Sequence, residues 1–302
     1  NGKYGMINMQ NWMFLSSFES LRKTLLTTQH FDSMLHLGPR AFDELSGDVV
    51  QNTAFVVTNA EPTTFKSSEP RVVNEDDPYS MITEPTIGGV YYWLVNGKNC
   101  EDKRQMFLAH TFVFTDVKQT DFEKIPGEVI AYWPSTNVLN LFAENKESVF
   151  GDYIIPRHGL ATSDNNRFLK LWYEINFYSG SLITRCDFSK KWYPMNKGGK
   201  FRKWYGNLDW VINYENDGEE IKAFAISLYK NSSRTIQNTQ FYFKESLTWS
   251  ALSSGPLAVQ WSDRGAVFGS GAHSAFTEDK HLMLYSLGLM NGKLMNFFLG
   301  IL

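Results

Sequence analysis

The segment from Arg185 to Tyr205 carries the side chains best suited to contact a nucleic acid. Its seven cations are Arg185, Lys190, Lys191, Lys197, Lys200, Arg202 and Lys203. Asp187 is its one acid, although the whole chain has a net charge of −3. Five aromatic residues alternate with these cations: Trp192, Tyr193, Phe201, Trp204 and Tyr205. Cations neutralise phosphates and aromatic rings stack on bases, so the combination indicates contact with DNA.

The turn signal Asn196-Lys197-Gly198-Gly199 predicts that this segment folds as a two-stranded ribbon. Such a ribbon fits the major groove, where Arg and Lys can read guanine edges. The alternative is an exposed edge hairpin whose lysines prevent aggregation. The DNA-contacting residues predicted here are Lys191, Trp192, Tyr193, Lys197, Lys200, Arg202, Lys203 and Trp204.

A second candidate site lies at Leu37-Gly38-Pro39-Arg40-Ala41-Phe42, between two expected strands. Ligands bind at strand ends in open α/β sheets. Phe42 could therefore be a stacking platform for a planar substrate, or it could cover the edge of the core.

A third candidate runs from Arg157 to Phe168, where Gly159, Ser163, Asp164 and Asn165 predict a tight loop whose side chains bond its own backbone. His158 could be a base or a ligand, but a lone histidine without a paired carboxylate is more often structural. The sequence contains no nucleophile elbow, no phosphate-binding glycine loop and no metal motif. The two cysteines cannot form a disulfide framework.

Residues 1–60 contain the second candidate site, and their pattern predicts an α/β fold. Lys3–Met9 predicts a short buried strand, and Phe31–Leu37 and Val49–Thr58 predict two more. Ser17–Leu26 predicts an amphipathic helix whose apolar side holds Phe18, Leu21, Leu25 and Leu26. We expect this helix to pack back onto parallel strands.

Residues 61–110 predict a linker at Glu61–Pro78, a strand at Gly88–Val95 and a helix near Glu101–His110. Residues 111–302 predict an α+β region with many short strands, because turn signals recur along them. A final helix is expected at Lys280–Leu302.

Composition limits the function classes. A hydrophobic fraction of 43% and a charged fraction of 20% are typical of a protein with a core, and the aromatic fraction of 15% favours strands and stacking surfaces. The net charge argues against indiscriminate polyanion binding. The apolar segment Leu282–Leu302 contains Asn291, Lys293 and Asn296, so it predicts a core helix and no contact with a membrane. Cysteine usage is consistent with a reducing compartment, and we expect a cytoplasmic protein.

Several segments resemble the second half of an adenine-specific DNA methyltransferase, and the match is nearest to the PglX type of BREX phage-defence systems. The segments are Gly5–Leu26, Leu37-Gly38, Asp48–Val57, Arg157–Glu174, Lys191–Gly218 and Lys244–Phe276. The stretches Gly5–Leu15 and Gly198–Asn207 look strongly family-specific. Gly159 with Thr162, Asp164 and Asn165 is similar to a looser pattern that opens target-recognition regions.

This resemblance implies an incomplete Rossmann-like methyltransferase sheet joined to a mixed target-recognition domain of short strands and helices. Residues 1–60 would be the C-terminal portion of the methyltransferase domain, 61–150 a connector and 151–302 the DNA-binding region. The family's Asn-Pro-Pro-Tyr loop and glycine-rich cofactor loop are absent from the sequence. We therefore expect no catalytic residue in this chain and no methylation by it alone; S-adenosylmethionine would bind the missing N-terminal part.

The resemblance also implies partners and a role for Phe42. The partners would be double-stranded DNA, the missing N-terminal part of the methyltransferase and other proteins of the defence system. Phe42 occupies the place of the aromatic residue that stacks on the flipped adenine in such enzymes. Two alternatives stay open: part of a fused type II restriction–modification enzyme, and an aromatic-rich carbohydrate-binding module. Steep salt dependence would favour DNA over sugar.

Overall fold

The computed structural model describes residues 2–42, 50–62, 88–144, 149–182, 187–253 and 255–302. The chain divides into two compact units, one formed mainly by residues 1–147 and one by residues 148–300. Most of the predicted linker, Glu61–Pro78, lies outside the described residues, as does Cys186. No helix among the described residues is long and apolar enough to cross a membrane.

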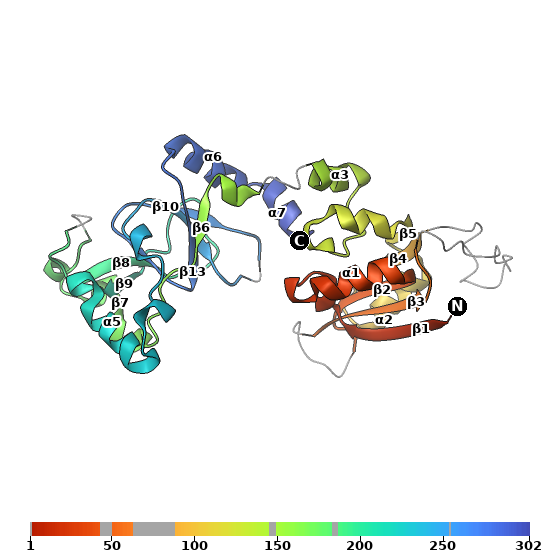
Figure 1. Cartoon of the computed structure of the whole chain (residues 1–302), viewed down its shortest axis with the longest axis horizontal. Helices are drawn as coiled ribbons and strands as arrows, with labels where there is room; N and C mark the ends of the chain where they lie inside the picture. Colours follow the sequence, from red (N-terminus) through yellow and green to blue (C-terminus); the bar gives the residue numbers. More distant parts are fainter. Residues whose placement is uncertain (1, 43–49, 63–87, 145–148, 183–186, 254) are drawn as a thin grey trace. The chain divides into compact units, whose positions relative to one another are not determined.

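The first unit is built on a five-stranded sheet with the order β1-β3-β2-β4-β5 (Figure 1). Its strands are β1 Lys3–Met9, β2 His30–Pro39, β3 Gln51–Thr58, β4 Gly89–Trp93 and β5 Val113–Val117. β3 is antiparallel to both β1 and β2, and β4 is parallel to β2. The strands β1, β2 and β4 therefore run in one direction, with the reversed strand β3 inserted between the first two.

The helices of the first unit are α1 Glu19–Thr28, α2 Cys100–Leu108 and α3 Thr136–Glu144. The first two pack on opposite faces of the sheet. The main core of the unit joins Leu26 of α1 to the sheet row of Phe55, Met34 and Tyr91. A smaller core joins Phe107 of α2 to β4 on the opposite face. Figure 1 shows α1 in front of the sheet and α2 behind it.

The predicted elements of residues 1–60 are confirmed, but the expected burial of the first strand is wrong. Six of the seven residues of β1 are exposed, and Ile7 retains 52% of its surface. The physical reason is position: β1 pairs with β3 alone among the described strands, and its side chains are exposed on both faces, as Met6 at 49% and Ile7 at 52% show.

The helix α1 buries a cation, although the sequence predicts that its buried face is an apolar stripe. Arg22 is completely buried, whereas Leu21 is 44% exposed. The Arg22 guanidinium donates hydrogen bonds to the carbonyls of Trp12 at 3.0 Å, Leu15 at 2.7 Å and Gly127 at 2.6 Å. These bonds join α1 to the segment that precedes it and to the turn at Gly127, and they satisfy a charge that would be costly to bury unpaired.

The second unit contains two four-stranded sheets, with the orders β11-β10-β13-β6 and β12-β8-β9-β7. Its strands are β6 Ile155–Arg157, β7 Leu169–Leu171, β8 Trp192–Asn196, β9 Trp210–Asn213, β10 Ser246–Ser250, β11 Val259–Ser262, β12 Val267–Phe268 and β13 Ala272–Phe276. Its helices are α4 Asn165–Phe168, α5 Glu215–Tyr229, α6 Lys280–Met290 and α7 Lys293–Leu299. The expected mixture of helices and many short strands is therefore confirmed, and the structure arranges these strands in two sheets.

Each sheet of the second unit has its own helical cover. Tyr193 of β8 and Ile212 of β9 pack with Ile221 of α5 in one core. Leu247 of β10 and Met283 of α6 pack in another. The expected single helix Lys280–Leu302 is wrong, because the chain breaks at Asn291-Gly292. The Asn291 amide bonds Leu287 O and both backbone groups of Val259, which ends α6 and attaches it to β11.

The prediction of a two-stranded ribbon that turns at Asn196–Gly199 is also wrong about the position of the turn. β8 pairs antiparallel with β9, which begins only at Trp210, so 13 residues separate the strands. Gly198 adopts a positive φ of 78°, but its position lies against Gly271 O, where a Cβ would come within 2.6 Å. The glycine thus serves a close backbone approach, and residues 197–209 form an extended loop, named here the basic loop.

Candidate functional site

The carboxyl ends of β1, β2 and β4 lie on one edge of the first sheet, because the three strands are parallel. Ligands of open α/β sheets bind at such an edge. Gln10 follows β1, His36 lies near the end of β2, and Trp93 ends β4. The start of the reversed strand β3 brings Gln51 to the same edge, opposite Pro39.

A hydrogen-bonded chain of side chains crosses this carboxyl edge. His36 Nε2 lies 2.9 Å from Gln10 Oε1, and Gln10 Nε2 donates to Gln51 Oε1 at 2.6 Å. His36 is 3% exposed, and its ring contacts Trp93 at a centroid distance of 5.0 Å. If Nε2 carries the proton and donates to Gln10, the half-buried Gln51 amide is held in one orientation at the edge.

His36 should make the first unit sensitive to acid. Burial, and secondarily Lys103, lowers the pKa of His36 to about 4. The unfolded chain binds a proton near pH 6.5 and the folded chain does not, so stability falls as the pH decreases from about 6.5 to about 4. At pH 5 this one group should lower the free energy of unfolding by about 2 kcal/mol relative to pH 7.5. Denaturant unfolding at the two pH values measures the loss.

The variant His36→Gln keeps an amide donor near Gln10 but cannot titrate. Burial also lowers the pKa of His30, so a smaller acid sensitivity should remain in this variant. An unchanged difference between pH 7.5 and pH 5 in His36→Gln would contradict the assignment.

Phe42 lies beyond the end of β2 and is 39% exposed, so its ring is accessible as a stacking platform requires. Between β2 and Phe42 the backbone turns at Arg40, whose φ is +58°. Nearby, the buried Lys103 donates to Leu37 O at 2.7 Å and to Leu94 O at 2.9 Å. Lys103 therefore fixes the ends of β2 and β4 from which the edge is built.

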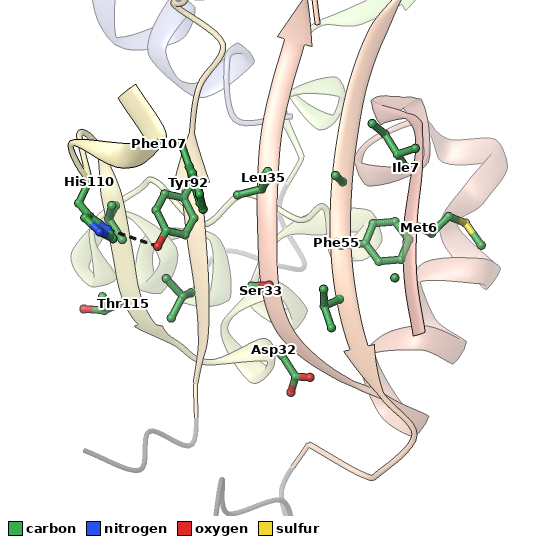
Figure 2. Close-up of a pocket in the computed structure, with 15 residues that line it drawn as sticks. Met6, Ile7, Asp32, Ser33, Leu35, Phe55, Tyr92, Phe107, His110 and Thr115 are labelled. Atoms are coloured by element: carbon green, nitrogen blue, oxygen red, sulfur yellow. Dashed lines mark hydrogen bonds between the residues drawn. The ribbon is translucent and has the colours of Figure 1, made fainter. Parts of the chain in front are cut away.

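The sheet face opposite α1 carries an apolar trough of about 740 Å³ (Figure 2). Two cross-strand rows form its floor: Gly5, Val56, Ser33 and Val90, and Ile7, Ala54, Leu35, Tyr92 and Val113. Figure 2 shows Phe107 of α2 beside Tyr92, whose hydroxyl lies 3.4 Å from His110 Nδ1. Ile7 and Val56, at 52% and 38% exposure, remain uncovered.

In the second unit, the basic loop of residues 197–209 is held rigidly against the first of the two sheets. Trp204 pairs with β11 through both of its backbone groups: Trp204 N donates to Val259 O at 2.9 Å, and Trp204 O accepts from Trp261 N at 2.8 Å. The Ser250 hydroxyl receives a hydrogen bond from Gly199 N at 3.0 Å. A loop braced in this way presents its outward side chains with little entropy to lose on binding.

The structure separates the predicted DNA-contacting residues into two groups. Lys200, Arg202 and Trp204 are exposed on the basic loop. The other five have roles within the fold: Tyr193 is buried in the core, Trp192 begins β8, Lys191 pairs with Glu215 at 3.4 Å, Lys197 lies 3.9 Å over the Trp210 ring, and Lys203 donates to Asn291 O at 2.7 Å.

The loop around Gly159 behaves as its residue types predict. Asp164 Oδ1 accepts from Arg167 N at 3.1 Å and caps α4, and Thr162 donates to Asn165 at 2.6 Å. A Cβ on Gly159 would lie 2.2 Å from Phe268 O. The ring of His158 lies 5.4 Å from that of His273. These contacts are those of a structural loop.

Sequence reasoning missed an exposed aromatic group between β7 and β8. Trp172 and Phe177 are 51% and 52% exposed, and Tyr173 and Tyr178 are 64% and 83% exposed. The signal that could have found it is four aromatic residues within Trp172–Tyr178, close to the predicted basic segment. Within the part of the chain that the structure describes, no group of His, Cys, Asp and Glu is arranged to hold a metal.

Two curated proteins are similar to this chain. It is 36% identical to the adenine-specific methyltransferase PglX of Lacticaseibacillus casei (strain Zhang) over all of the chain and 24% of that protein. It is 35% identical to the adenine-specific methyltransferase BrxX of Escherichia coli O9:H4 (strain HS) over 98% of the chain and 22% of that protein. The chain thus spans about a quarter of the length of these relatives, and the predicted resemblance is confirmed.

A solved structure is similar in fold. The Type IIL restriction-modification enzyme MmeI, solved in complex with DNA, matches with a TM-score of 0.53 at 11% sequence identity. The match covers 97% of this chain and 35% of the MmeI chain. No protein-family model matches the sequence.

Proposed function

We propose that this chain is a segment of an adenine-specific DNA methyltransferase of the PglX and BrxX type, and that it supplies target-DNA recognition and part of the pocket for the flipped adenine. The observation that carries the proposal is the identity of 35–36% to these two methyltransferases over nearly the whole chain. The parent enzyme would transfer a methyl group from S-adenosylmethionine to the amino nitrogen of a specific adenine.

The topology of the first unit supports a Rossmann-like methyltransferase sheet. β1 and β2 are parallel and are connected through α1, which is the crossover that such sheets use. Residues 1–60 would end the methyltransferase domain, 61–150 would connect, and 151–302 would recognise DNA. β4 and β5 extend the same sheet, so the connector would be partly a structural continuation of it.

The trough and the outer edge of β1 support contact with the rest of the methyltransferase. Ile7 and Val56 expose apolar surface on a sheet face that α2 covers only near β4. An open edge and an uncovered apolar face both favour pairing with further chain. The occupant we propose is the part of the longer protein that holds the cofactor, since the relatives are about four times as long as this chain.

A two-piece experiment tests the proposal. The 302-residue chain should bind duplex DNA without methylating it, and adding the separately expressed remainder of the parent should restore methyl transfer. The double substitution Ile7→Asp and Val56→Asp should weaken association of the two pieces at least tenfold, because carboxylates would face the apolar contact. The matched control Leu228→Asp changes a leucine of α5 with 49% exposure. Equal association by all three chains would contradict the contact.

Phe42 gives a prediction for the assembled enzyme. Phe42→Ala should lower the methylation rate about tenfold and change duplex affinity less than twofold, since stacking on an extruded base is worth about 1–3 kcal/mol. Single-turnover methylation and equilibrium DNA binding, measured on the same preparation, separate the two effects. Phe42→Tyr should keep most of the rate. Equal methylation rates for Phe42→Ala and the wild type would contradict the stacking role and would mean that Phe42 only covers the edge of the core.

The alternatives differ in their support. The two methyltransferase relatives give no support to a carbohydrate-binding module. A fused restriction enzyme is a related parent, and DNA cleavage by the full-length protein would distinguish it.

A further inference from the structure

The exposed aromatic group of the second unit borders a pocket of about 340 Å³, named here the aromatic pocket. Pro194 of β8 and Val211 of β9 lie directly opposite each other in the sheet and form its floor. Trp172 and Phe177 line it, and so do Ser262 at the end of β11 and the residues Asp263, Arg264 and Ala266 that follow. A pocket of this size, lined mainly by apolar residues with a few polar groups, is typical of a small-molecule site.

The backbone near Trp172 and Phe177 is hydrogen-bonded to neighbouring parts of the second unit. Trp172 N donates to Asp209 O at 3.0 Å, and the Leu171 amide donates to the Glu174 carboxylate at 2.7 Å. Beyond Phe177, Ser181 N donates to Trp192 O at 2.8 Å. These bonds fix the backbone that carries Trp172 and Phe177, and each ring packs edge-on against its neighbour, Trp172 on Tyr173 at a centroid distance of 5.6 Å and Phe177 on Tyr178 at 5.9 Å.

The lining of the aromatic pocket also includes polar groups suited to a base edge. Asp263 lines the pocket, and its carboxylate is oriented by the Trp261 indole, which donates to Oδ1 at 3.0 Å. Arg264, which is exposed, lines it from the next position. A carboxylate accepts from the exocyclic amino group of cytosine or adenine, and a guanidinium donates to ring nitrogen or carbonyl acceptors. Aromatic faces with this polar rim match a nucleobase.

We propose that the aromatic pocket binds one unpaired DNA base, stacked against Trp172 and Phe177, at a site separate from the carboxyl edge of the first unit. This inference rests on the proposed DNA-binding function and assigns a second, base-specific contact to the recognition region. The pocket would distinguish a nucleobase from an abasic sugar.

The test compares two oligonucleotides of equal phosphate count bound by the full chain. One is a single-stranded 12-mer of deoxyadenylate, and the other is the same length of abasic sugar-phosphate. The wild type should bind the base-containing strand about tenfold more tightly. Trp172→Ala with Phe177→Ala should reduce this ratio to about one and leave abasic binding unchanged. Trp172→Phe should keep most of the preference.

A matched control and a second ligand complete the design. Tyr285→Ala with Phe297→Ala removes two aromatic residues of α6 and α7 with 68% and 47% exposure and should keep the preference. A preference that persists without Trp172 and Phe177, or that the control loses equally, would overturn the proposal. Adenosine, followed by saturation-transfer NMR, should bind the wild type and not the pocket variant. Adenosine binding without DNA binding would refute the proposed function alone, and no adenosine binding with no base preference would refute the pocket.

Discussion

Replacing Arg22 by Met is expected to lower the free energy of unfolding of the first unit by about 3 kcal/mol. The methionine preserves most of the buried volume but leaves the carbonyls of Trp12, Leu15 and Gly127 without the donors that reach them at 2.6–3.0 Å. Each buried acceptor deprived of its partner costs about 1–3 kcal/mol. The entropy of ordering α1 against its neighbours is then no longer offset.

Hydrogen exchange followed by mass spectrometry measures this effect on the whole chain. Peptides from residues 1–147 should exchange roughly 100-fold faster in Arg22→Met, while peptides from residues 148–300 serve as an internal reference. The matched control is Arg104→Met, because Arg104 forms an exposed ion pair of 3.4 Å with Glu101. The control should change stability by less than about 0.5 kcal/mol. Equal protection from hydrogen exchange in Arg22→Met and Arg104→Met would show that the buried guanidinium does not stabilise the first unit.

Replacing Lys200 and Arg202 by Ala should weaken binding of duplex DNA by roughly 50-fold at 0.1 M salt. Both side chains are exposed on the basic loop, whose backbone is fixed by β11 and Ser250. Each lost phosphate contact should reduce the slope of log K against log salt by about 0.9. Titrations between 50 and 200 mM salt should therefore show a slope shallower by about 1.8.

The structure supplies a charge-matched control for this prediction. Lys230 and Lys293 are exposed cations outside the basic loop, and their double substitution by Ala removes the same charge. Its salt slope should remain near that of the wild type. Lys203 is left unchanged in both variants because it donates to Asn291 O at the end of α6, so its loss would disturb folding. A slope that falls equally in both variants would show an effect of net charge and would move recognition away from the basic loop.

The elements of the first 60 residues were predictable because their signals are local. Residues 51–58 are rich in β-branched and aromatic types, and they form β3 close to the expected bounds. The apolar positions of α1 were less informative, since Leu21 is exposed and Arg22 is buried. Burial of a cation depends on which carbonyls tertiary packing brings within reach. Two of the three acceptors precede the helix, and the third is 105 residues away.

The predicted DNA-contacting residues also fall into those that the sequence could identify and those that it could not. The accumulation of cations between residues 185 and 205 predicted a basic surface, and Lys200, Arg202 and Trp204 are exposed on it. Tyr193 could not be distinguished from its half-buried neighbours Trp192 and Pro194, because alternation along a strand does not say which face meets the core. The aromatic pocket could not be predicted either, since Trp172, Pro194 and Arg264 meet only when three distant segments pack together.

The sequence by itself therefore determined the resemblance to a methyltransferase, the order of strands and helices near its start and the location of its cations. These depend on residue identity and on periods of two or four residues. The tertiary structure decided which side chains are accessible: that β1 is an exposed edge, that the turn at Gly198 is a close approach instead of a hairpin, and that Lys203 serves a helix end. The physical reason is that exposure and hydrogen bonding are set by neighbours distant in the chain.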